Sequence, residues 1–415
     1  MATGQRAPLK PLGEALAQLL AAVTAIQPAE QVATLEADGR VLAHDVVSAL
    51  HVPPQDNSSM DGYALRVLDV AAPGVVLPVS QRIAAGTSGS PLVPGTVARI
   101  FTGAPVPEGA DAIAMQEDCA AMPESDGAVP QVQVNVVPRM GQWIRRAGED
   151  VSRGAVVLQA GQRLGPAEQG LAASIGMDTL GVVRRPRVAL FSTGDELVMP
   201  GSLAPQDMPP GAIYNSNRFF LNSLLRRLGC AVTDFGIVPD QFDATQQALR
   251  EAGATHDVIL TSGGVSVGEE DHIKPAVQSL GSLDLWQIAI KPGKPFAHGR
   301  VGAAHFIGLP GNPVSSFVTF LLLVRPFLLR LQGVQNVAPQ GQTVRADFDW
   351  PRADKRQEFL RVRRNANGGL DLFHNQSSGV LTSAVWGDGL VDNPGGQTIR
   401  QGDWVRFISF AELLA

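Results

Sequence analysis

The sequence predicts a multidomain α/β plus β protein in which a central, mostly parallel α/β unit is flanked by β-rich regions. From Arg187 onward, continuous apolar runs such as "RVALF" and "DVIL" alternate with helix-like segments, which is typical of a parallel sheet covered on both faces. Residues 47–148 are rich in Val, Gly and Pro and contain alternating runs such as "QVQVNVV", which indicates a β domain with many turns. The residues after 332 alternate again, as in "DWVRFISF", and predict a small β barrel or sandwich.

The first helix is predicted at residues 12–23, where five apolar residues share one face: Leu12, Leu16, Leu19, Leu20 and Val23. Two basic residues precede this segment and make it faintly similar to a signal peptide. Polar residues between the leucines, and the lack of a small-residue cleavage site, favour an amphipathic helix instead. A second helix is predicted at "PAEQGLAASIGM", because Pro166 suits a first helical turn.

In the α/β unit, strands are predicted at "RVALFSTGDEL", "AVTDFGIV", "DVILTS", "LWQIAI" and "HFIGLP". The segment "NSNRFFLNSLLRRLGC" predicts a helix that Asn215 or Ser216 caps and Gly229 ends. Another helix is predicted at "DATQQALREAG", and a last one after Asn312. The run "VSSFVTFLLLVRPFLLRL" contains two arginines and a proline, so it predicts a buried helix rather than a membrane span.

The composition excludes several functional classes. The 415 residues suggest about three domains of roughly 150 residues each. The net charge is −6, and no basic tail or arginine run occurs, so the sequence does not support nucleic-acid binding. The chain has two cysteines, Cys119 and Cys230, and no Cys or His spacing that fits a zinc site. This cysteine usage predicts a reducing, cytoplasmic location.

Four polar loops are predicted to follow strands of the α/β unit, at residues 192–197, 239–243, 261–271 and 309–316. Ligands of open α/β sheets bind beyond the carboxyl ends of the strands. Glycines there let backbone N–H groups approach an anion, although tight turns need glycine for their own geometry as well. The predicted anion-binding residues of these loops are Ser262, Gly263, Gly264, Ser266, Gly268, Pro310, Gly311, Asn312 and Ser315.

Three carboxylates lie in the same loops: Glu196, Asp240 and Asp271. Acids beside an anion are unfavourable unless a cation lies between them, so these residues predict a Mg²⁺ site shared with phosphate. The alternative is helix N-capping. Lys291 and Lys294 flank a proline–glycine turn in "KPGKPFAHG" and are predicted to hold an oxyanion, with an exposed surface pair as the alternative.

Other catalytic motifs fit less well. No P-loop motif and no dinucleotide-binding motif after a strand is present. The letters "GVSVG" match the G-x-S-x-G pattern of serine hydrolases, with Ser266 as the nucleophile. Two glycines separate this motif from its strand, and only His298 and His305 offer a later base. A hydrolase is therefore disfavoured.

Six segments in order resemble the molybdopterin molybdenumtransferase (MoeA) family, which includes the E domain of gephyrin. They are "PPQDNSSMDGYAL", "FTGAPVPEGADAI", "FSTGDEL", "LTSGGVSVGEEDHIKPA", "KPGKPFAHG" and "GLPGNPVSSF". The resemblance implies the last step of molybdenum cofactor assembly. Adenylylated molybdopterin and molybdate are bound, the phosphoanhydride is cleaved with help from Mg²⁺, AMP leaves, and molybdenum enters the dithiolene.

The resemblance also implies roles for individual residues. The implied catalytic residues are Asp61, Thr102, Asp150, Glu196, Asp240 and Asp271, of which Glu196, Asp240 and Asp271 are the predicted Mg²⁺ ligands. Lys291, Lys294, Arg361 and Ser378 are implied to bind substrate or anion. Many relatives have two acids where this chain has "PDQ", so Asp240 stands without the second acid, which Gln241 replaces. Arg356 is an alternative to Arg361, because the surrounding motif is short.

Relatives form elongated homodimers in which the active site lies between the α/β domain of one subunit and the N-terminal domains of the other. The resemblance therefore predicts four domains. Residues 1–46 with 149–185 form an elongated dimerisation domain, and residues 47–148 form an inserted β-rich domain. Residues 186–331 form the molybdopterin-binding α/β domain, and residues 332–415 form a C-terminal β barrel.

Further partners follow from the same resemblance: a molybdopterin adenylyltransferase and molybdoenzyme delivery proteins, with no membrane partner. Two other functions stay open. One is a non-catalytic scaffold of the gephyrin type, which the lack of an extra domain or linker disfavours. The other is molybdopterin adenylyltransferase activity, whose fold residues 187–331 resemble and which the flanking β regions disfavour.

Overall fold

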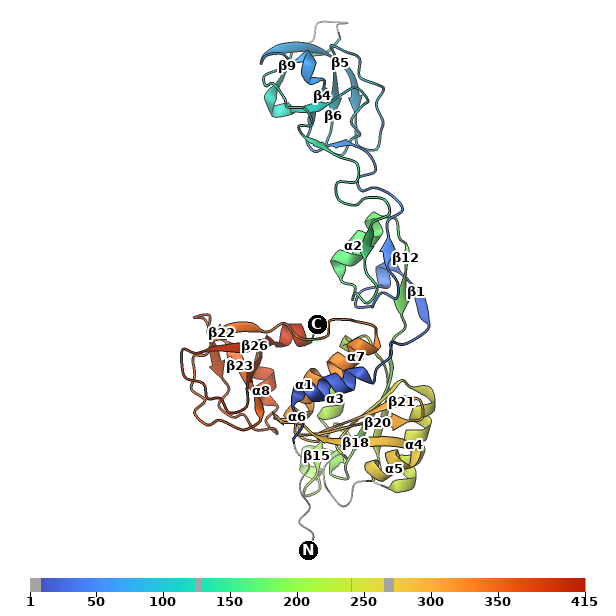
Figure 1. Ribbon diagram of the computed structural model, residues 1–415, viewed down its shortest axis with the longest axis vertical. Helices are drawn as coiled ribbons and strands as arrows, with labels where there is room; N and C mark the ends of the chain where they lie inside the picture. The colour runs from blue at the N-terminus through green and yellow to red at the C-terminus, as the bar shows by residue number, and fades with distance from the viewer. Residues whose placement is uncertain (1–8, 124–128, 240, 265–271, 415) are drawn as a thin grey trace.

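The computed structural model describes residues 9–123, 129–239, 241–264 and 272–414. The chain forms an elongated molecule of four bodies, of which two lie side by side at one end and the other two extend away from them (Figure 1). We call them the upper body (residues 57–145), the middle body (residues 29–47 and 156–183), the α/β body (residues 187–331 with the first helix) and the C-terminal body (residues 342–414). This arrangement agrees with the predicted multidomain α/β plus β-rich class.

The upper body is a six-stranded sheet in the order β7-β4-β6-β5-β9-β8. Its two faces carry separate apolar cores, because successive residues of one strand point to opposite faces. Leu65 and Val97 belong to one core, whereas their neighbours Ala64 and Ala98 belong to the other. The strands are β4 (Gly62–Leu65), β5 (Val75–Ile83), β6 (Val97–Ile100), β7 (Ala112–Met115), β8 (Cys119–Ala121) and β9 (Gln131–Val134).

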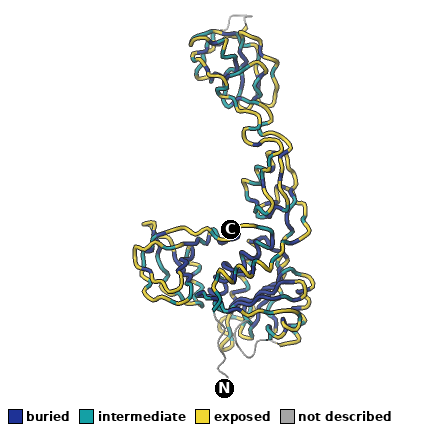
Figure 2. Tube along the Cα trace, viewed as in Figure 1, coloured by how far each residue is buried: buried dark blue, intermediate teal, exposed yellow. Residues whose placement is uncertain are grey.

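The middle body joins the upper body to the rest of the chain. β1 (Ala29–Ala33) pairs with β12 (Thr179–Val183), and β2 (Val46–Val47) pairs with β11 (Val156–Leu158). Helix α2 (Pro166–Ser174) begins with Pro166 as predicted. Two segments lead to the upper body, where β3 (Asn57–Ser58) pairs with β10 (Ile144–Arg145), and Figure 2 shows these segments as largely exposed.

The α/β body contains a six-stranded sheet in the order β16-β13-β17-β21-β20-β18. The first four strands are parallel, and β20 and β18 add an antiparallel edge. The predicted mostly parallel sheet is therefore present. Its strands are β13 (Arg187–Thr193), β16 (Ala231–Val238), β17 (Val258–Ser262), β18 (Gly281–Gln287), β20 (Pro295–Val301) and β21 (Ala304–Leu309). A small parallel pair, β14 (Leu197–Val198) and β15 (Ile213–Tyr214), follows β13.

Helices cover both faces of this sheet, and the dark core in Figure 2 lies between them. α4 (Phe242–Thr255) and α5 (Ile273–Leu280) pack on one face. α1 (Leu12–Ala21), α3 (Asn217–Arg227) and the helix from α6 (Pro313–Thr319) to α7 (Arg325–Leu331) pack on the other. The predicted apolar stripes of α1 and α3 face this core.

The most apolar helix is part of the core. Residues Pro313–Leu331 have a mean hydropathy of 1.7 and are long enough to span a membrane, but 94% of this stretch is buried inside the protein. A π-helical turn at Phe320–Val324 joins α6 to α7. Pro326, which follows this turn, lacks the N–H that a regular helix needs, and such a turn accommodates the missing hydrogen bond. The prediction of a buried helix is confirmed.

The C-terminal body is a sheet in the order β19-β23-β25-β26-β22, and β24 also pairs with β23. Its strands are β22 (Gln342–Arg345), β23 (Gln357–Arg364), β24 (Leu370–Leu372), β25 (Gly389–Asn393) and β26 (Trp404–Ser409), accompanied by α8 (Thr382–Trp386) and α9 (Phe410–Leu413). The edge strand β19 (Ile290–Lys291) comes from the α/β body, so the two bodies share one sheet. Phe359 and Phe410 extend the α/β core into this junction.

Two buried histidines make the fold sensitive to acid. His298 on β20 and His305 on β21 stack with 5.8 Å between ring centroids, and both rings pack against Phe327. Burial lowers the pKa of His298 from 6.5 to about 4 and the pKa of His305 to about 3. The folded protein therefore keeps both rings neutral at pH values where the unfolded chain binds protons.

This difference predicts a loss of stability as the pH falls below 6.5, continuing toward the folded pKa values. Each histidine is expected to lower the free energy of unfolding by about 2 kcal/mol when the pH falls from neutral to about pH 5. His305→Phe keeps an aromatic ring beside Phe327 and should remove roughly half of this loss. Urea unfolding at both pH values measures it, and an unchanged pH dependence in the variant would refute the assignment.

Candidate functional site

A cavity of about 770 Å³ opens at the carboxyl ends of β13, β17 and β21. This is the edge of a parallel sheet where ligands bind in open α/β folds. Eight of the predicted site residues line it: Glu196, Ser262, Gly263, Gly264, Pro310, Gly311, Asn312 and Ser315. The structure therefore brings three of the four predicted loops together around one cavity.

Gly263 and Gly264 lie in close contact with β13 and α5, so neither position can hold a side chain. Gly263 has φ +96°, and a Cβ there would lie 2.8 Å from the Thr193 carbonyl oxygen. Gly264 has φ +66°, and a Cβ there would lie 2.8 Å from the Ile273 side chain. A side chain at either position would thus be both strained and in collision. The loop after β17 can approach β13 only because these residues are glycines.

Not every predicted glycine has a backbone N–H that is free to bind an anion. The Gly263 N–H donates to the Leu309 carbonyl at 3.1 Å, which extends the sheet, so it cannot also bind an anion. Among the described residues, the N–H groups of Gly264, Gly311 and Asn312 have no such partner. They are the donors that a ligand in the cavity would meet. The missing side chain of Gly263 instead lets the loop lie against Thr193.

Asn217, at the start of α3, connects two of the loops. Its side-chain amide donates to the Ser262 hydroxyl at 3.0 Å and to the Gly311 carbonyl at 2.7 Å. Sequence reasoning missed this residue because it treated "NSN" only as a helix start. Of the two predicted cap residues, Asn215 accepts from the first-turn N–H of Arg218 at 3.2 Å, whereas Ser216 makes no side-chain hydrogen bond at the helix start.

Two further residues of the cavity wall have unsatisfied polar atoms. The Thr193 hydroxyl and the Asn215 side-chain nitrogen are buried and have no hydrogen-bond partner among the described residues. Leaving such a group unpaired costs about 1–3 kcal/mol. A polar ligand that reorganises this wall would recover that energy. Sequence reasoning missed both residues, since nothing in their spacing distinguishes them from ordinary strand-end residues.

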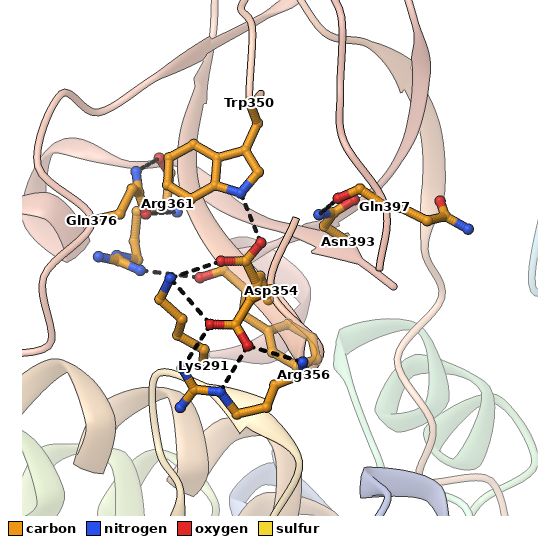
Figure 3. Close-up of polar contacts among 10 residues, drawn as sticks. Lys291, Trp350, Asp354, Arg356, Arg361, Gln376, Asn393 and Gln397 are labelled. Atoms are coloured by element: carbon orange, nitrogen blue, oxygen red, sulfur yellow. Dashed lines mark hydrogen bonds and ion pairs between the residues drawn. The ribbon is translucent and has the colours of Figure 1, made fainter. Parts of the chain in front are cut away.

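Lys291 lies in a network of charges where the α/β and C-terminal bodies meet (Figure 3). Its ammonium is 3.0 Å from the Glu358 carboxylate and 3.6 Å from the Asp354 carboxylate. The Glu358 side chain is only 1% exposed, and its second oxygen accepts from the Trp350 indole N–H at 2.7 Å. Arg356 pairs with Asp354 at 2.7 Å, and this hydrogen bond holds the pKa of Asp354 well below its usual range.

Arg361 has no carboxylate partner among the described residues. Its guanidinium donates to the Ser383 hydroxyl and to the carbonyls of Phe359 and Ser377, at 3.1–3.3 Å. It is 1% exposed, and burial lowers its pKa to about 10. Arg356, the alternative from the sequence, is neutralised by Asp354 instead.

The chain around Lys294 and Ser378 lies at one end of the cavity. Pro295 and Gly379 line the cavity and are the direct neighbours of Lys294 and Ser378. The Ser378 carbonyl accepts from the Val314 N–H at 2.9 Å, which ties this loop to the start of α6. Lys294 has no ion pair within the described part of the chain. We call this region the cationic end; its charged residues are Lys291, Lys294, Arg356, Arg361, Asp354 and Glu358.

The predicted residues of the N-terminal half lie elsewhere. Asp61 precedes β4 in the upper body, and its carboxylate accepts from the Thr102 N–H at 2.8 Å and from the Thr102 hydroxyl at 2.7 Å. These two hydrogen bonds lower the pKa of Asp61. Asp150 is exposed on the segment that returns to the middle body. The middle body separates the upper body from the cavity within one chain (Figure 1).

Four predicted site residues lie outside the described residues: Asp240, Ser266, Gly268 and Asp271. Of the predicted Mg²⁺ ligands, only Glu196 belongs to the described part, where it lines the cavity. No group of three or more His, Cys, Asp or Glu side chains that could hold a metal occurs within that part. The Mg²⁺ site therefore stays a prediction.

Comparisons with known proteins cover nearly the whole chain. The MoeA N-terminal region (domain I and II) matches residues 10–176, a probable molybdopterin binding domain matches residues 189–330, and the MoeA C-terminal region (domain IV) matches residues 343–410. The molybdopterin molybdenumtransferase of Haemophilus influenzae is 42% identical over 79% of each chain. Molybdopterin molybdenumtransferase 2 of Mycobacterium tuberculosis is 38% identical over 86% of this chain and 89% of its own.

Solved structures agree with this result. The molybdopterin biosynthesis MoeA protein of Pyrococcus horikoshii is 28% identical and superposes with a TM-score of 0.84 over 97% of this chain and all of its own. The similarity extends over the upper, middle, α/β and C-terminal bodies, so it concerns the whole architecture and not one shared domain. This chain belongs to the molybdopterin molybdenumtransferase family.

Proposed function

We propose that this protein, a transferase of molybdenum cofactor biosynthesis by its family, inserts molybdate into adenylylated molybdopterin with release of AMP. One observation carries the proposal: the cavity at the strand ends has free backbone donors and Glu196 on its wall and adjoins the cationic end. A polyanionic substrate needs donors and cations, and its cleavage needs a site for a leaving group. The backbone donors, the cations and Glu196 all belong to the cavity or to the cationic end beside it.

The two parts of this region have different tasks in the proposal. The N–H groups of Gly264, Gly311 and Asn312, with the Ser262 and Ser315 side chains, bind the phosphate and pterin portion. Lys294, Arg361 and Ser378 bind the oxyanion. The unpaired ammonium of Lys294 and the carboxylate-free guanidinium of Arg361 support this assignment, and they favour Arg361 over the paired Arg356.

Mg²⁺ fits the donor set of the cavity. Glu196 offers carboxylate oxygens and Ser262 a hydroxyl oxygen, which are the hard ligands that Mg²⁺ prefers. We propose Glu196, with Asp240 and Asp271, as its protein ligands. When bound, the ion would supply positive charge to the phosphate oxygens during cleavage. Asn217 orients the Ser262 hydroxyl through its 3.0 Å hydrogen bond.

We propose a homodimer in which Asp61, Thr102 and Asp150 of one subunit complete the site of the other. The distance between the upper body and the cavity within one chain supports this arrangement (Figure 1). The Thr102 hydrogen bonds keep Asp61 ionised and oriented, as a catalytic carboxylate requires. The domain boundaries at residues 46, 148, 185 and 331 belong to the same proposal.

The remaining proposals concern the surroundings of the enzyme. A bridge between Ala346, which follows the edge strand β22, and Leu370 of β24 supports a closed barrel there. The resemblance suggests a cytoplasmic protein that takes its substrate from a molybdopterin adenylyltransferase and passes its product to molybdoenzyme delivery proteins. No membrane or nucleic-acid partner is proposed. The matches outside the α/β body count against an isolated adenylyltransferase.

The proposed function is tested by AMP release from adenylylated molybdopterin. The purified protein is expected to release AMP only when both molybdate and Mg²⁺ are present. Glu196→Gln should reduce the rate at least about a hundredfold, because it removes a charge that acts at the reacting phosphate. Consumption of ATP with molybdopterin in the absence of molybdate would instead indicate an adenylyltransferase, and no turnover at all would indicate a scaffold.

A further inference from the structure

The cationic end contains more charge than a simple lysine pair. Lys291 and Arg356 lie there in contact with two carboxylates, Asp354 and Glu358. Two more cations belong to the same segments: Lys294 is in the turn that follows Lys291, and Arg361 is on β23 with Glu358. Four positive and two negative charges leave two net positive charges. A tetrahedral oxyanion with two negative charges, such as molybdate, would balance them.

The carboxylates are not distributed evenly among these cations. Asp354 and Glu358 contact Lys291 and Arg356, so that these four groups together are neutral. Lys294 and Arg361 retain their full charge, because no carboxylate contacts them within the described residues. The two lysines of the "KPGKP" loop are thus chemically different, although they look equivalent in the sequence.

Glu358 is buried, and each of its carboxylate oxygens accepts a hydrogen bond. It pairs with Lys291 in the parallel ladder between β19 and β23, which brings the two side chains to the same position along the sheet. One carboxylate oxygen accepts from Lys291 and the other from Trp350. With 1% exposure, the carboxylate cannot be screened by water as a surface acid would be.

We propose that Glu358 is a specificity-determining residue of the oxyanion site. Its buried carboxylate neutralises Lys291 and lowers the net charge of the cationic end from three to two, so it limits how much more tightly the site binds a tetrahedral dianion than a monoanion. This inference rests on the proposed function, since it assumes that the oxyanion binds beside Lys294 and Arg361. The main role of Lys291 is then structural: its ion pair with Glu358 connects the α/β body to the C-terminal body.

Calorimetric titration of the full chain with molybdate and with perrhenate tests the proposal. The two ions have the same tetrahedral shape, but at mildly alkaline pH molybdate is a dianion and perrhenate a monoanion. The wild-type protein should bind molybdate more tightly. Because Coulomb energy scales with the product of the charges, Glu358→Gln should strengthen molybdate binding about tenfold and perrhenate binding about threefold at the same ionic strength.

Two control variants separate charge from structure. Trp350→Phe removes the indole hydrogen bond to Glu358 without changing charge and should leave the molybdate-to-perrhenate ratio unchanged. Glu251→Gln changes the net charge equally on the exposed side of α4 and should alter neither affinity. If Glu358→Gln fails to fold, Asp354→Asn removes a negative charge from the same end and should give the same pattern.

The outcomes distinguish this inference from the proposed function. A wild-type protein that binds neither ion would overturn the proposed oxyanion site and the inference with it. The inference alone would be overturned if the wild-type protein binds molybdate but Glu358→Gln does not change the two affinities as predicted. That is the case if both affinities stay unchanged, if they fall, or if they change by the same factor. Equal binding of both ions by the wild type would also overturn it.

Discussion

Mixing two inactive variants, Asp61→Ala and Glu196→Ala, is expected to restore molybdate-dependent AMP release. Asp61 lies in the upper body and Glu196 at the cavity, and the middle body separates them within one chain. Each homodimer should lose activity by at least about a hundredfold, because each of its sites lacks one acidic group. A heterodimer contains one site in which both residues are intact.

The size of the recovery follows from symmetry. If subunits exchange at random, half of the dimers are heterodimers with one working site of two, so the mixture should reach about a quarter of wild-type activity. Native mass spectrometry confirms the exchange. A mixture of Asp61→Ala with Thr102→Val serves as the control and should stay inactive, because both residues lie in the upper body. Confirmed heterodimers of the first pair without activity would show that the site is formed within one chain.

Gly263→Ala is expected to abolish most of the activity. At φ +96° an alanine is strained by about 1–3 kcal/mol, and its Cβ would lie 2.8 Å from the Thr193 carbonyl oxygen. The loop after β17 must therefore move away from β13, which also breaks the Gly263–Leu309 hydrogen bond. A displacement of about 1 Å in a substrate-binding loop reduces the rate roughly a hundredfold.

Gly86→Ala is the matched control for this variant. Gly86 has φ +79°, lies in the upper body and has nothing within 4 Å of an added Cβ. The backbone strain is thus similar, but no collision follows and the cavity is distant. Denaturant unfolding should show a loss of stability in both variants, whereas AMP release should fall only in Gly263→Ala. Normal turnover by Gly263→Ala would mean that the loop can shift without affecting the site.

The sequence alone predicted the elements and the edge of the sheet where the site lies. Period-3.6 stripes identified α1 and α3, and continuous apolar runs identified the strands of the parallel sheet. Polar, glycine-rich loops after those strands predicted the cavity, since parallel strands place their carboxyl ends at one edge. These predictions succeed because buried positions recur with the period of a helix or a strand. The pattern of apolar residues within a short segment is therefore enough to identify the element.

The contacts within the site depended on the tertiary structure. Asn217 joins Ser262 to Gly311, which is 94 residues away along the chain, and Lys291 is paired with Glu358, 67 residues away. The hydrogen bond of the Gly263 N–H to Leu309 likewise arises only when β17 and β21 are neighbours. No spacing in the sequence predicts which distant side chain will meet which. That choice follows from how the bodies pack, and burial then decides which charges are neutralised and which, like those of Lys294 and Arg361, stay without a carboxylate.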